Sequence, residues 1–465
     1  MSEVGPVPLT RQAAQRLQGL AEGELSPEVR RKAAVCLLDY VSACIGGLTA
    51  PWAPAVLAYA ATRGGAPQSH LWGSSHLVAA EDAAFGNGAL GHSLIRDDMH
   101  LLSSSHIGVL VLPAVLAAAQ REHLSGQALV RGIVAGYEMA VRLGTAVQFS
   151  KAHSHFRPSG INGPFGAAAA VAVAVGADED TTAAALGFAA NAASGLNEWP
   201  WAGGQEVNTH AGLAARNGLA AFDLARAGLR PSDTVLEGRD GLFAAYGDQR
   251  SGTELFMQGL AQPVPGILDV TFKPYPGCNL IQTPITAALL VHARLAGGAH
   301  NMADIEQVVI GTFEQAQAYP GCDNTGPLDT VQQTKMSLQY GVCSALLYGR
   351  VDEQTYTRFA DPDLQRLIAG TTITVEQEHC TALLELRQSG RVEVRLTDGT
   401  VLGVSVDDVP WLDEAAVEQR LRGVAADVIP PAELNRMIDL VGRLWDLPDC
   451  NELFAVFASA ISSPG

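Results

Sequence analysis

The sequence is poor in aromatic and in charged residues. Of its 465 residues, 6% are aromatic and 17% are charged, whereas 48% are hydrophobic. This composition excludes an intrinsically disordered chain and indicates a globular protein with a core of mostly aliphatic side chains. The length is sufficient for two or three domains.

Positive charge is also scarce. The chain carries 30 lysines and arginines against 48 aspartates and glutamates, which gives a formal net charge of -18. Binding of nucleic acid needs a basic face for the phosphates, so a nucleic-acid partner is excluded. An anionic substrate would have to meet a locally positive pocket within this acidic molecule.

Signals for export, membranes and common cofactors are missing as well. The seven cysteines form no C-x-x-C pair, the opening MSEVGPVPLTRQ has no signal pattern, and no apolar run is long enough to span a membrane. We therefore expect a cytoplasmic protein without a membrane partner. No dinucleotide-binding glycine motif, P-loop or G-x-S-x-G motif is present. His153 and His155 lack a third ligand at motif spacing, so we expect neither a metal nor a cofactor.

The first 265 residues show the periodicity of helices and no run of strands. Ser26-Pro27-Glu28 is typical of a helix start, because serine caps the first turn and proline fits within it. Further helices are predicted at Glu81–His92, Pro113–Gln120, Ala128–Thr145, Phe165–Val175, Thr181–Ser194 and Ala211–Ala227.

The pattern changes after Pro263-Val264-Pro265-Gly266. Strands are predicted at Val308–Phe313, Ala382–Arg387, Arg391–Thr397 and Val401–Val406, with hairpin signals at Ser389-Gly390 and Asp398-Gly399. Beyond Val409-Pro410 the chain is helical again. We therefore predict a mostly α protein, with a large all-helical domain built from residues 1–265 and 410–465 and a smaller inserted α+β domain, residues 266–409.

One polar stretch, within Gly91–Pro113, lies between two apolar segments. It reads GHSLIRDDMHLLSSSHIGVLVLP and holds Asp97, Asp98, His100 and His106. Burying such groups is costly unless they bind or react with something, so the stretch is a candidate site. The alternative is an ordinary polar loop that caps the following helix.

Six segments, in this order along the chain, carry a resemblance to a known family. They contain AAEDAAFGNGALGHSLIRDDMH, HIGVLVLPAVLAAA, GINGPFGAAAAVAVAVGAD, HAGLAARNGLAAFDLARAGLRPSDTVLEGRDGLF, FKPYPGCNLIQTPITAALLV and KMSLQY. Together they resemble the MmgE/PrpD family, which includes 2-methylcitrate dehydratase, cis-aconitate decarboxylase and iminodisuccinate epimerase. The resemblance covers roughly residues 10–460.

The resemblance implies a helical domain and an α+β lid domain, usually in a homodimer, with a cofactor-free site between them for small di- or tricarboxylates. The family's polar site positions fall on Asp97, Asp98, His106, Lys273, Tyr275 and Lys335. The sequence departs from the dehydratase and decarboxylase pattern at Ile95, Met99, Arg157, Val207 and Gln282. The spacing D-D-x-H is more similar to the epimerase branch.

These residue types suit removal of a proton beside a carboxylate, which needs a base and nearby cations. His106 is our first candidate for the base, and either Asp97 or Asp98 would orient its ring. Lys273 and Arg157 would hold substrate carboxylates, unless Arg157 is a surface cation. Epimerisation also needs a second acid/base, for which the candidates are His100, Lys273 and Tyr275.

Four further residues are candidates for substrate binding. Ser105 belongs to the polar stretch. Cys278 lies five residues after Lys273, and is either in the pocket or a small buried hydrophobic residue. His210 belongs to a family motif or is a structural histidine. Lys335 is predicted to start a helix, where the helix dipole disfavours a cation, and this favours a functional or domain-contact role.

Two classes of function follow. The first is an enzyme that abstracts a proton alpha to a carboxylate. An iminodisuccinate-type epimerase leads within this class, and a dehydratase or decarboxylase is the alternative. The second class is a family member that has kept the fold, has lost catalysis and acts as a binding protein.

Overall fold

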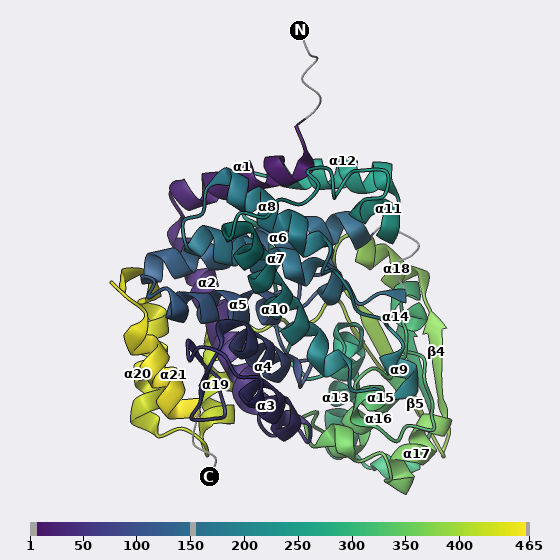
Figure 1. Ribbon diagram of the computed structural model, residues 1–465. Coiled ribbons are helices and arrows are strands. Elements are labelled where there is room, and N and C mark those ends of the chain that lie inside the picture. The colour runs from purple at the N-terminus through teal and green to yellow at the C-terminus, as the bar shows by residue number, and fades with distance from the viewer. Residues whose placement is uncertain (1–6, 149–154, 462–465) are drawn as a thin grey trace.

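Helices dominate the computed structural model, which describes residues 7–148 and 155–461 (Figure 1). The N-terminal part holds α1 (Leu9–Glu22), α2 (Pro27–Gly47), α3 (Ala53–Thr62), α4 (Ala80–His92), α5 (Gly108–Arg121), α6 (Gly126–Gln148), α7 (Pro158–Ala174), α8 (Glu179–Ala190), α9 (Trp199–Ala202), α10 (Val207–Arg226), α11 (Leu242–Tyr246) and α12 (Gln249–Leu260). A two-residue pair, β1 (Ser69–His70) and β2 (Leu77–Val78), is the only strand pairing described in this part.

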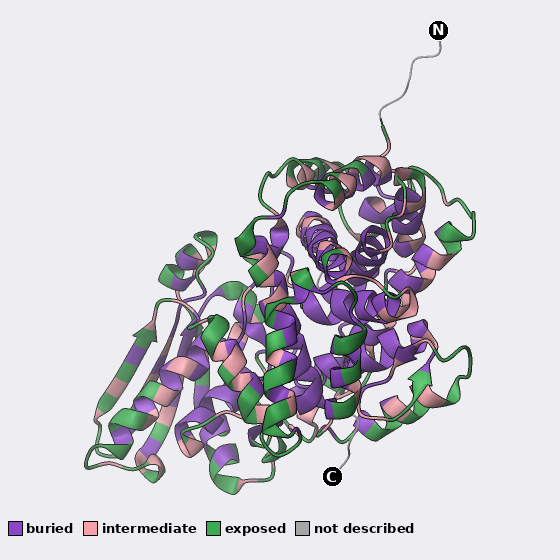
Figure 2. Cartoon of the chain, turned by 90° about the vertical axis from the view of Figure 1, so that its left-hand side faces the viewer, coloured by how far each residue is buried: buried purple, intermediate pink, exposed green. Residues whose placement is uncertain are grey.

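Small residues let the central helices approach closely. Within α4, a side-chain carbon at Gly88 would lie 3.0 Å from the backbone of Gly212 in α10, so these two helices meet at their glycines. Every residue of α7 is buried, and Figure 2 shows buried residues concentrated in the helices in the middle of the molecule. As a result the C-terminal end of α4, where the polar stretch begins, lies in the protein interior.

The predicted helix start at Ser26 is confirmed, because its side chain accepts a hydrogen bond from the Val29 amide. The helix predicted at Pro113–Gln120 begins earlier, at Gly108, and contains Pro113. The helix predicted at Phe165–Val175 also begins earlier, at Pro158.

The C-terminal part contains a small mixed sheet of order β4-β3-β5-β6, in which β4 runs parallel to β3 and the other neighbours are antiparallel. Its strands are β3 (Ile305–Thr312), β4 (Thr371–Val375), β5 (Gly390–Leu396) and β6 (Val401–Val406), and its helices are α13 (Gln282–Ala296), α14 (Glu314–Ala318), α15 (Val331–Thr334), α16 (Leu338–Tyr348), α17 (Pro362–Ala369) and α18 (Gln377–Leu384). Helix α13 covers one face of the sheet, packing on β5 and β6.

The strand predicted at Ala382–Arg387 is wrong, because this segment ends α18 and leaves Leu384 and Leu386 largely exposed. Apolar side chains alternate along this segment, but no described strand lies beside it to bury them. Consequently Ser389-Gly390 is not a hairpin turn but the entry to β5, whereas the turn at Asp398-Gly399 is confirmed between β5 and β6. Strand β4, which the sequence analysis missed, occupies the sheet edge instead.

The last helices return to the first ones. Helices α19 (Glu414–Ala425), α20 (Pro431–Gly442) and α21 (Asn451–Ile461) share one hydrophobic cluster with α2 (Figure 1). The sheet region has a separate cluster, which contains Ile310, Val392 and Val394. Within the described ranges, no helix has both the length and the hydropathy needed to cross a bilayer.

Candidate active site

The loop between α4 and α5 is held in place by Asp98. One of its carboxylate oxygens accepts the amide of Gly108, at the start of α5, at 2.8 Å, and the other accepts the Tyr137 hydroxyl at 2.7 Å. Burial, with Asp39 close by, raises the pKa of Asp98 to about 7. Asp98 therefore has the capping role that was the alternative interpretation of this stretch.

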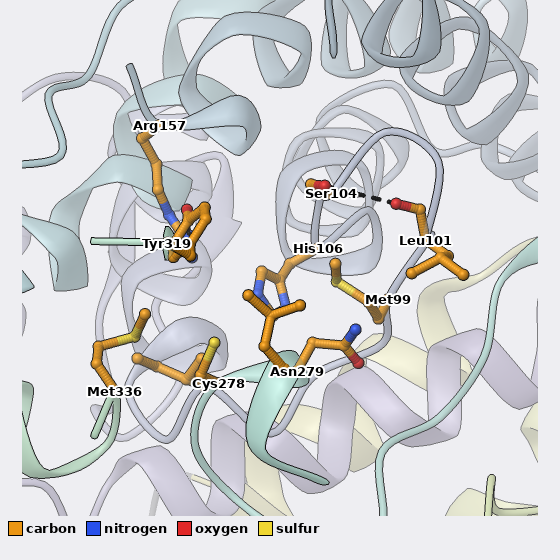
Figure 3. A pocket seen from close by; sticks show the side chains of 11 residues that line it. Met99, Leu101, Ser104, His106, Arg157, Cys278, Asn279, Tyr319 and Met336 are labelled. Carbon is orange, nitrogen blue, oxygen red and sulfur yellow. Dashed lines mark hydrogen bonds between the residues drawn. The ribbon is translucent and has the colours of Figure 1, made fainter. Parts of the chain in front are cut away.

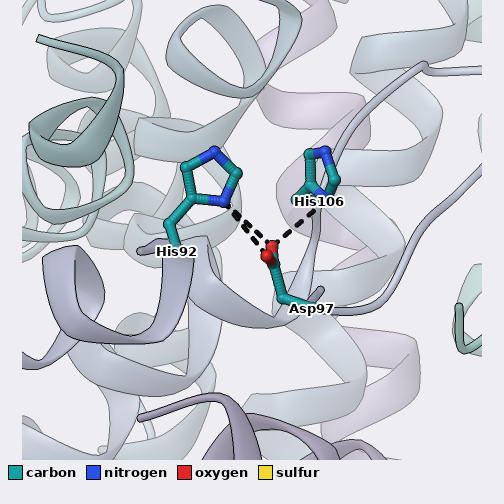
Figure 4. A group of neighbouring side chains, drawn as sticks. All are labelled: His92, Asp97 and His106. Atoms are coloured by element: carbon teal, nitrogen blue, oxygen red, sulfur yellow. Dashed lines mark hydrogen bonds and ion pairs between the residues drawn. The ribbon is translucent and has the colours of Figure 1, made fainter. Parts of the chain in front are cut away.

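Its neighbour Asp97 bridges two imidazoles (Figure 4). The Nδ1 atom of His92 lies 3.1 Å from the Asp97 carboxylate, and the Nδ1 atom of His106 lies at the same distance from it. All three side chains are almost completely buried. A carboxylate between two Nδ1 atoms accepts both N–H groups, which leaves the lone pairs of both imidazoles on Nε2.

Burial and neighbouring charges determine which of these three side chains are protonated. Burial and the nearby Lys273 lower the pKa of His106 to about 3, and burial also lowers the pKa of His92. Burial alone would raise the pKa of Asp97, but the two facing imidazoles hold it well below its usual range. At neutral pH the group is therefore an aspartate between two neutral histidines. The Nε2 atom of His106 has no hydrogen-bond partner among the described residues and can accept a proton.

A small cavity lies beside His106, with a volume of about 50 Å³. Figure 3 shows the His106 ring in the middle of the labelled residues that line this space. The helical part supplies Ile95, Met99, Leu101, Ser104, His106 and Arg157, and the C-terminal part supplies Cys278, Asn279, Leu280, Tyr319 and Met336. The cavity thus lies where the two parts of the chain meet.

Arg157 is a buried cation at this cavity, not a surface residue. Its side chain is 4% exposed, and its two terminal nitrogens lie 3.2 Å from His92 Nε2 and 3.3 Å from the Tyr319 hydroxyl. Its Nε atom is buried and has no hydrogen-bond partner among the described residues. A guanidinium held in this way can offer N–H groups to a carboxylate. Of the two loop histidines considered as metal ligands, His153 lies outside the described residues.

Two lysines join the C-terminal part to the polar loop. Lys273 donates to the carbonyl oxygens of Ile95 and Gly277, and Lys335 donates to the carbonyl oxygen of Ser93 at 2.9 Å. Burial lowers the pKa of Lys273 to about 8 and that of Lys335 to about 7. Neither ammonium group lines the cavity. They act on the site through its electrostatics and by fixing the loop.

The prediction that Lys335 starts a helix is wrong. Lys335 follows the last residue of the short helix α15, and α16 begins at Leu338 with Ser337 as its cap. The helix was predicted to begin three residues before its observed start, so the argument from the helix dipole no longer applies.

Four other candidates do not line the cavity. His100 pairs with Ser103 at 2.9 Å and faces a separate cavity that contains Arg142 and Asp269. Ser105 accepts a hydrogen bond from Asn162 at 2.9 Å. Tyr275 and His210 also lie outside the cavity lining, although the charge of Arg157 contributes to lowering the pKa of His210 to about 3, mainly through burial.

The departures from the family pattern have different consequences. Ile95 and Met99 give the cavity apolar walls. Val207 packs in the hydrophobic cluster of the sheet region. Gln282 is fully buried and fixes the loop before it, because its side chain bonds both the amide and the carbonyl of Tyr275.

Sequence reasoning missed His92, Tyr319, Asn279 and Met336. A signal for His92 was present, since it is the histidine of the H-x-x-x-x-D-D pattern and ends a helix that points at Asp97. No local signal marked the other three, which come from separate turns.

A metal fits this group poorly. Ligand atoms of His92, Asp97 and His106 lie within 4.8 Å of one another, a spacing that a divalent ion can use. However, the Arg157 guanidinium lies 3.2 Å from His92 Nε2, and the buried Lys273 adds further positive charge. Like charges at such distances repel strongly where water is excluded, so we assign no metal here.

The fold and the site define a protein with a buried acid–base group between a helical part and a sheet-containing part. The chain belongs to the MmgE/PrpD family, whose N-terminal domain matches residues 11–254 and whose C-terminal domain matches residues 275–443. It is 24% identical to cis-aconitate decarboxylase from Aspergillus terreus, over 96% of this chain and 95% of the relative. It is also 24% identical to cis-aconitate decarboxylase from Homo sapiens, over 96% of this chain and 93% of the relative.

Proposed function

We propose that this protein is a cofactor-independent enzyme that removes a proton from the carbon next to a carboxylate of a small di- or tricarboxylate. One observation carries the proposal: His106 faces a cavity with its Nδ1 atom held by Asp97 and with Arg157 on the same wall. This arrangement supplies a neutral base of defined tautomer and a cation for an anionic substrate.

Substrate binding would complete the base. Burial and the nearby Lys273 lower the pKa of His106 to about 3. A bound carboxylate adds negative charge beside the imidazole, which raises the pKa of His106 toward the neutral range. As the proton leaves carbon, negative charge develops on the substrate carboxylate, where Arg157 can stabilise it.

Within this chemistry we propose epimerisation of a succinyl unit, as in iminodisuccinate. The cavity of about 50 Å³ is small, so one carboxylate-bearing arm of the substrate would enter it rather than the whole molecule. Its walls at Ile95, Met99 and Met336 are apolar, and Arg157 is the one cationic side chain among the described lining residues. A substrate that places one carboxylate in the cavity fits this charge.

The second candidate is decarboxylation or dehydration of a tricarboxylate. It is favoured by the full-length similarity to two cis-aconitate decarboxylases. Both reactions, like epimerisation, begin with the binding of a substrate carboxylate. They differ from epimerisation in their products: decarboxylation gives an alkene and carbon dioxide, and dehydration gives an alkene and water.

Deuterium exchange tests the proposal. Purified protein is incubated in deuterated water with stereochemically pure iminodisuccinate and, separately, with cis-aconitate, citrate and malate, and the products are followed by NMR. We expect deuterium at the alpha carbon with one of them, and a loss of about 10³-fold in His106→Ala. An inverted centre identifies an epimerase, and an alkene product identifies a lyase. No exchange with any of them would leave a binding protein and refute the proposed enzyme.

His100→Gln is the matched control, because it replaces a buried histidine of the same loop that faces another cavity. It is expected to retain the exchange activity.

A further inference from the structure

Epimerisation needs proton transfer on two faces of one carbon, and His106 serves only one of them. The other lining residues with an ionisable side chain are Arg157, Tyr319 and Cys278. His100 and Tyr275 do not line the cavity, and the Lys273 ammonium is occupied by two backbone carbonyls. The candidates of the sequence analysis for the second acid/base are therefore not placed for this role.

Two of the three lining groups are poorly suited to it. Arg157 offers only N–H donors, which face His92 and Tyr319, and has no acceptor for a proton. The Tyr319 hydroxyl lies 3.3 Å from Arg157 and 3.5 Å from the Asn197 side-chain amide. Burial raises the pKa of Tyr319, which makes it a weak acid and leaves little phenolate to act as a base.

Cys278 lies on the wall opposite the helical part. It directly precedes the short turn Asn279–Ile281, and Figure 3 shows its sulfur on the C-terminal side of the cavity, facing the space next to His106. Cys278 is 7% exposed, and its backbone amide donates a hydrogen bond to the carbonyl oxygen of Lys335 at 2.9 Å. The same lysine anchors the loop that carries Asp97, so the two walls are tied together close to both reacting groups.

A second cysteine sets the state of this thiol. The Sγ atom of Cys322 lies 4.0 Å from the Sγ atom of Cys278, within the range of a sulfur hydrogen bond. Cys322 is fully buried, and its pKa is raised well above the usual value, first by this contact, in which either sulfur can donate. The same contact, with Lys273 and Arg157 nearby, lowers the pKa of Cys278 to about 7, which keeps thiol and thiolate both populated near neutral pH.

We propose that Cys278 is the second acid/base of the site and exchanges a proton with the alpha carbon from the face opposite to His106. This inference rests on the proposed epimerase function. In one direction the C–H bond breaks and its proton goes to His106 Nε2, while the electron pair moves into the adjacent carboxylate. The Cys278 thiol then gives its proton to the same carbon on the other face. The reverse direction starts from the Cys278 thiolate, and no oxidant or further reactant is needed.

The test separates exchange from inversion. Stereochemically pure iminodisuccinate is incubated in deuterated water with wild type, Cys278→Ala and Cys278→Ser, and both the deuterium content and the configuration are read. In the variants His106 still removes and returns a proton on its own face. We expect exchange with retained configuration, starting from one stereoisomer only, and a loss of inversion by on the order of 10²- to 10⁴-fold.

Each possible outcome supports or refutes the role of Cys278. Inversion at the wild-type rate in both variants refutes the role of Cys278 and leaves the proposed epimerase intact. Loss of exchange together with inversion in folded variants, as judged by thermal melting, also refutes it, because the thiol would then support the whole site. Absence of exchange in wild type refutes the epimerase itself. Serine preserves the size of the side chain should alanine disturb packing.

A measurement without substrate addresses the thiol directly. The rate of alkylation of Cys278 by iodoacetamide, followed by peptide mass spectrometry, should rise with a midpoint near pH 7. Cys343, a buried cysteine of the same region that contacts Thr371 and not the cavity, is the internal comparison, and burial raises its pKa to about 12. A midpoint for Cys278 above pH 9 would contradict the acid/base role.

Discussion

The two walls of the cavity are built differently. On the helical side the polar groups bind one another: Asp97 holds His92 and His106, and Arg157 contacts His92. On the C-terminal side Leu280 and Met336 are apolar, Tyr319 contacts Arg157, and the Cys278 thiol has a soft partner, Cys322. Charge and fixed geometry thus come from one wall, and shape and a polarisable thiol come from the other.

The difference suggests a division of work between the walls. A network of buried hydrogen bonds in a dry interior is rigid, so it can hold a base in one tautomer. Apolar side chains can change without leaving a buried polar group unpaired, so the C-terminal wall can adapt to another substrate at low cost in stability. Substitutions of the hydrogen-bonded groups should therefore reduce activity on every substrate, and those of the apolar side chains of the C-terminal wall should mainly change substrate preference.

The largest effect is expected for Asp97→Asn. The amide can accept from one imidazole but presents an N–H₂ group to the other, so at least one ring loses its tautomer or its orientation. A carboxylate that orients a catalytic histidine is worth on the order of 10⁴-fold in kcat where it has been removed elsewhere. We expect a loss of 10²-fold or more in the exchange rate measured by NMR.

Asp82→Asn, a buried aspartate of α4 that pairs with Arg63, is the control for loss of a carboxylate in the helical part. An unchanged exchange rate in Asp97→Asn would contradict the view that the helical wall holds the base in place.

A smaller effect is expected for Arg157→Lys. Lysine keeps the charge but cannot contact His92, Tyr319 and a substrate carboxylate with one planar group. Loss of a charged hydrogen bond costs about 1.5–3 kcal/mol, or roughly a 10- to 100-fold rise in KM, with a lesser change in kcat. Steady-state kinetics separates the two constants, and Arg121→Lys, at a bidentate pair with Asp223 away from the cavity, is the control. A KM within twofold of wild type would show that Arg157 does not bind substrate.

The smallest effect is expected for Met336→Ala in the C-terminal wall. Its side chain is 2% exposed and limits the cavity, so its removal makes room for about one methyl branch on the substrate. One methylene in an apolar pocket changes discrimination by on the order of tenfold. The ratio of kcat/KM for a methyl-substituted diacid over the parent should rise accordingly. Met302→Ala, at a partly buried methionine of the same region, should leave the ratio unchanged.

Parts of this fold and site were predictable from local pattern. Helical periodicity and the cap at Ser26 gave the helices of the N-terminal part, and the turn at Asp398-Gly399 gave the β5–β6 pair. The end of α18 and the residues after it, Ala382–Arg387, were mistaken for a strand because so short a segment cannot separate the two periodicities. The domain boundaries at 265 and 409 remain a prediction.

The sequence by itself marked a polar stretch with two aspartates and three histidines between apolar segments, as either a site or a loop that caps the following helix. It could not assign roles to Asp97 and Asp98, which are neighbours in the chain. Only the tertiary structure separated them: Asp98 meets the start of α5 and Tyr137, and Asp97 meets His92 and His106. Such assignments depend on contacts between groups brought together by packing, and no local spacing encodes the positions of Arg157, Cys278 and Tyr319 around one cavity.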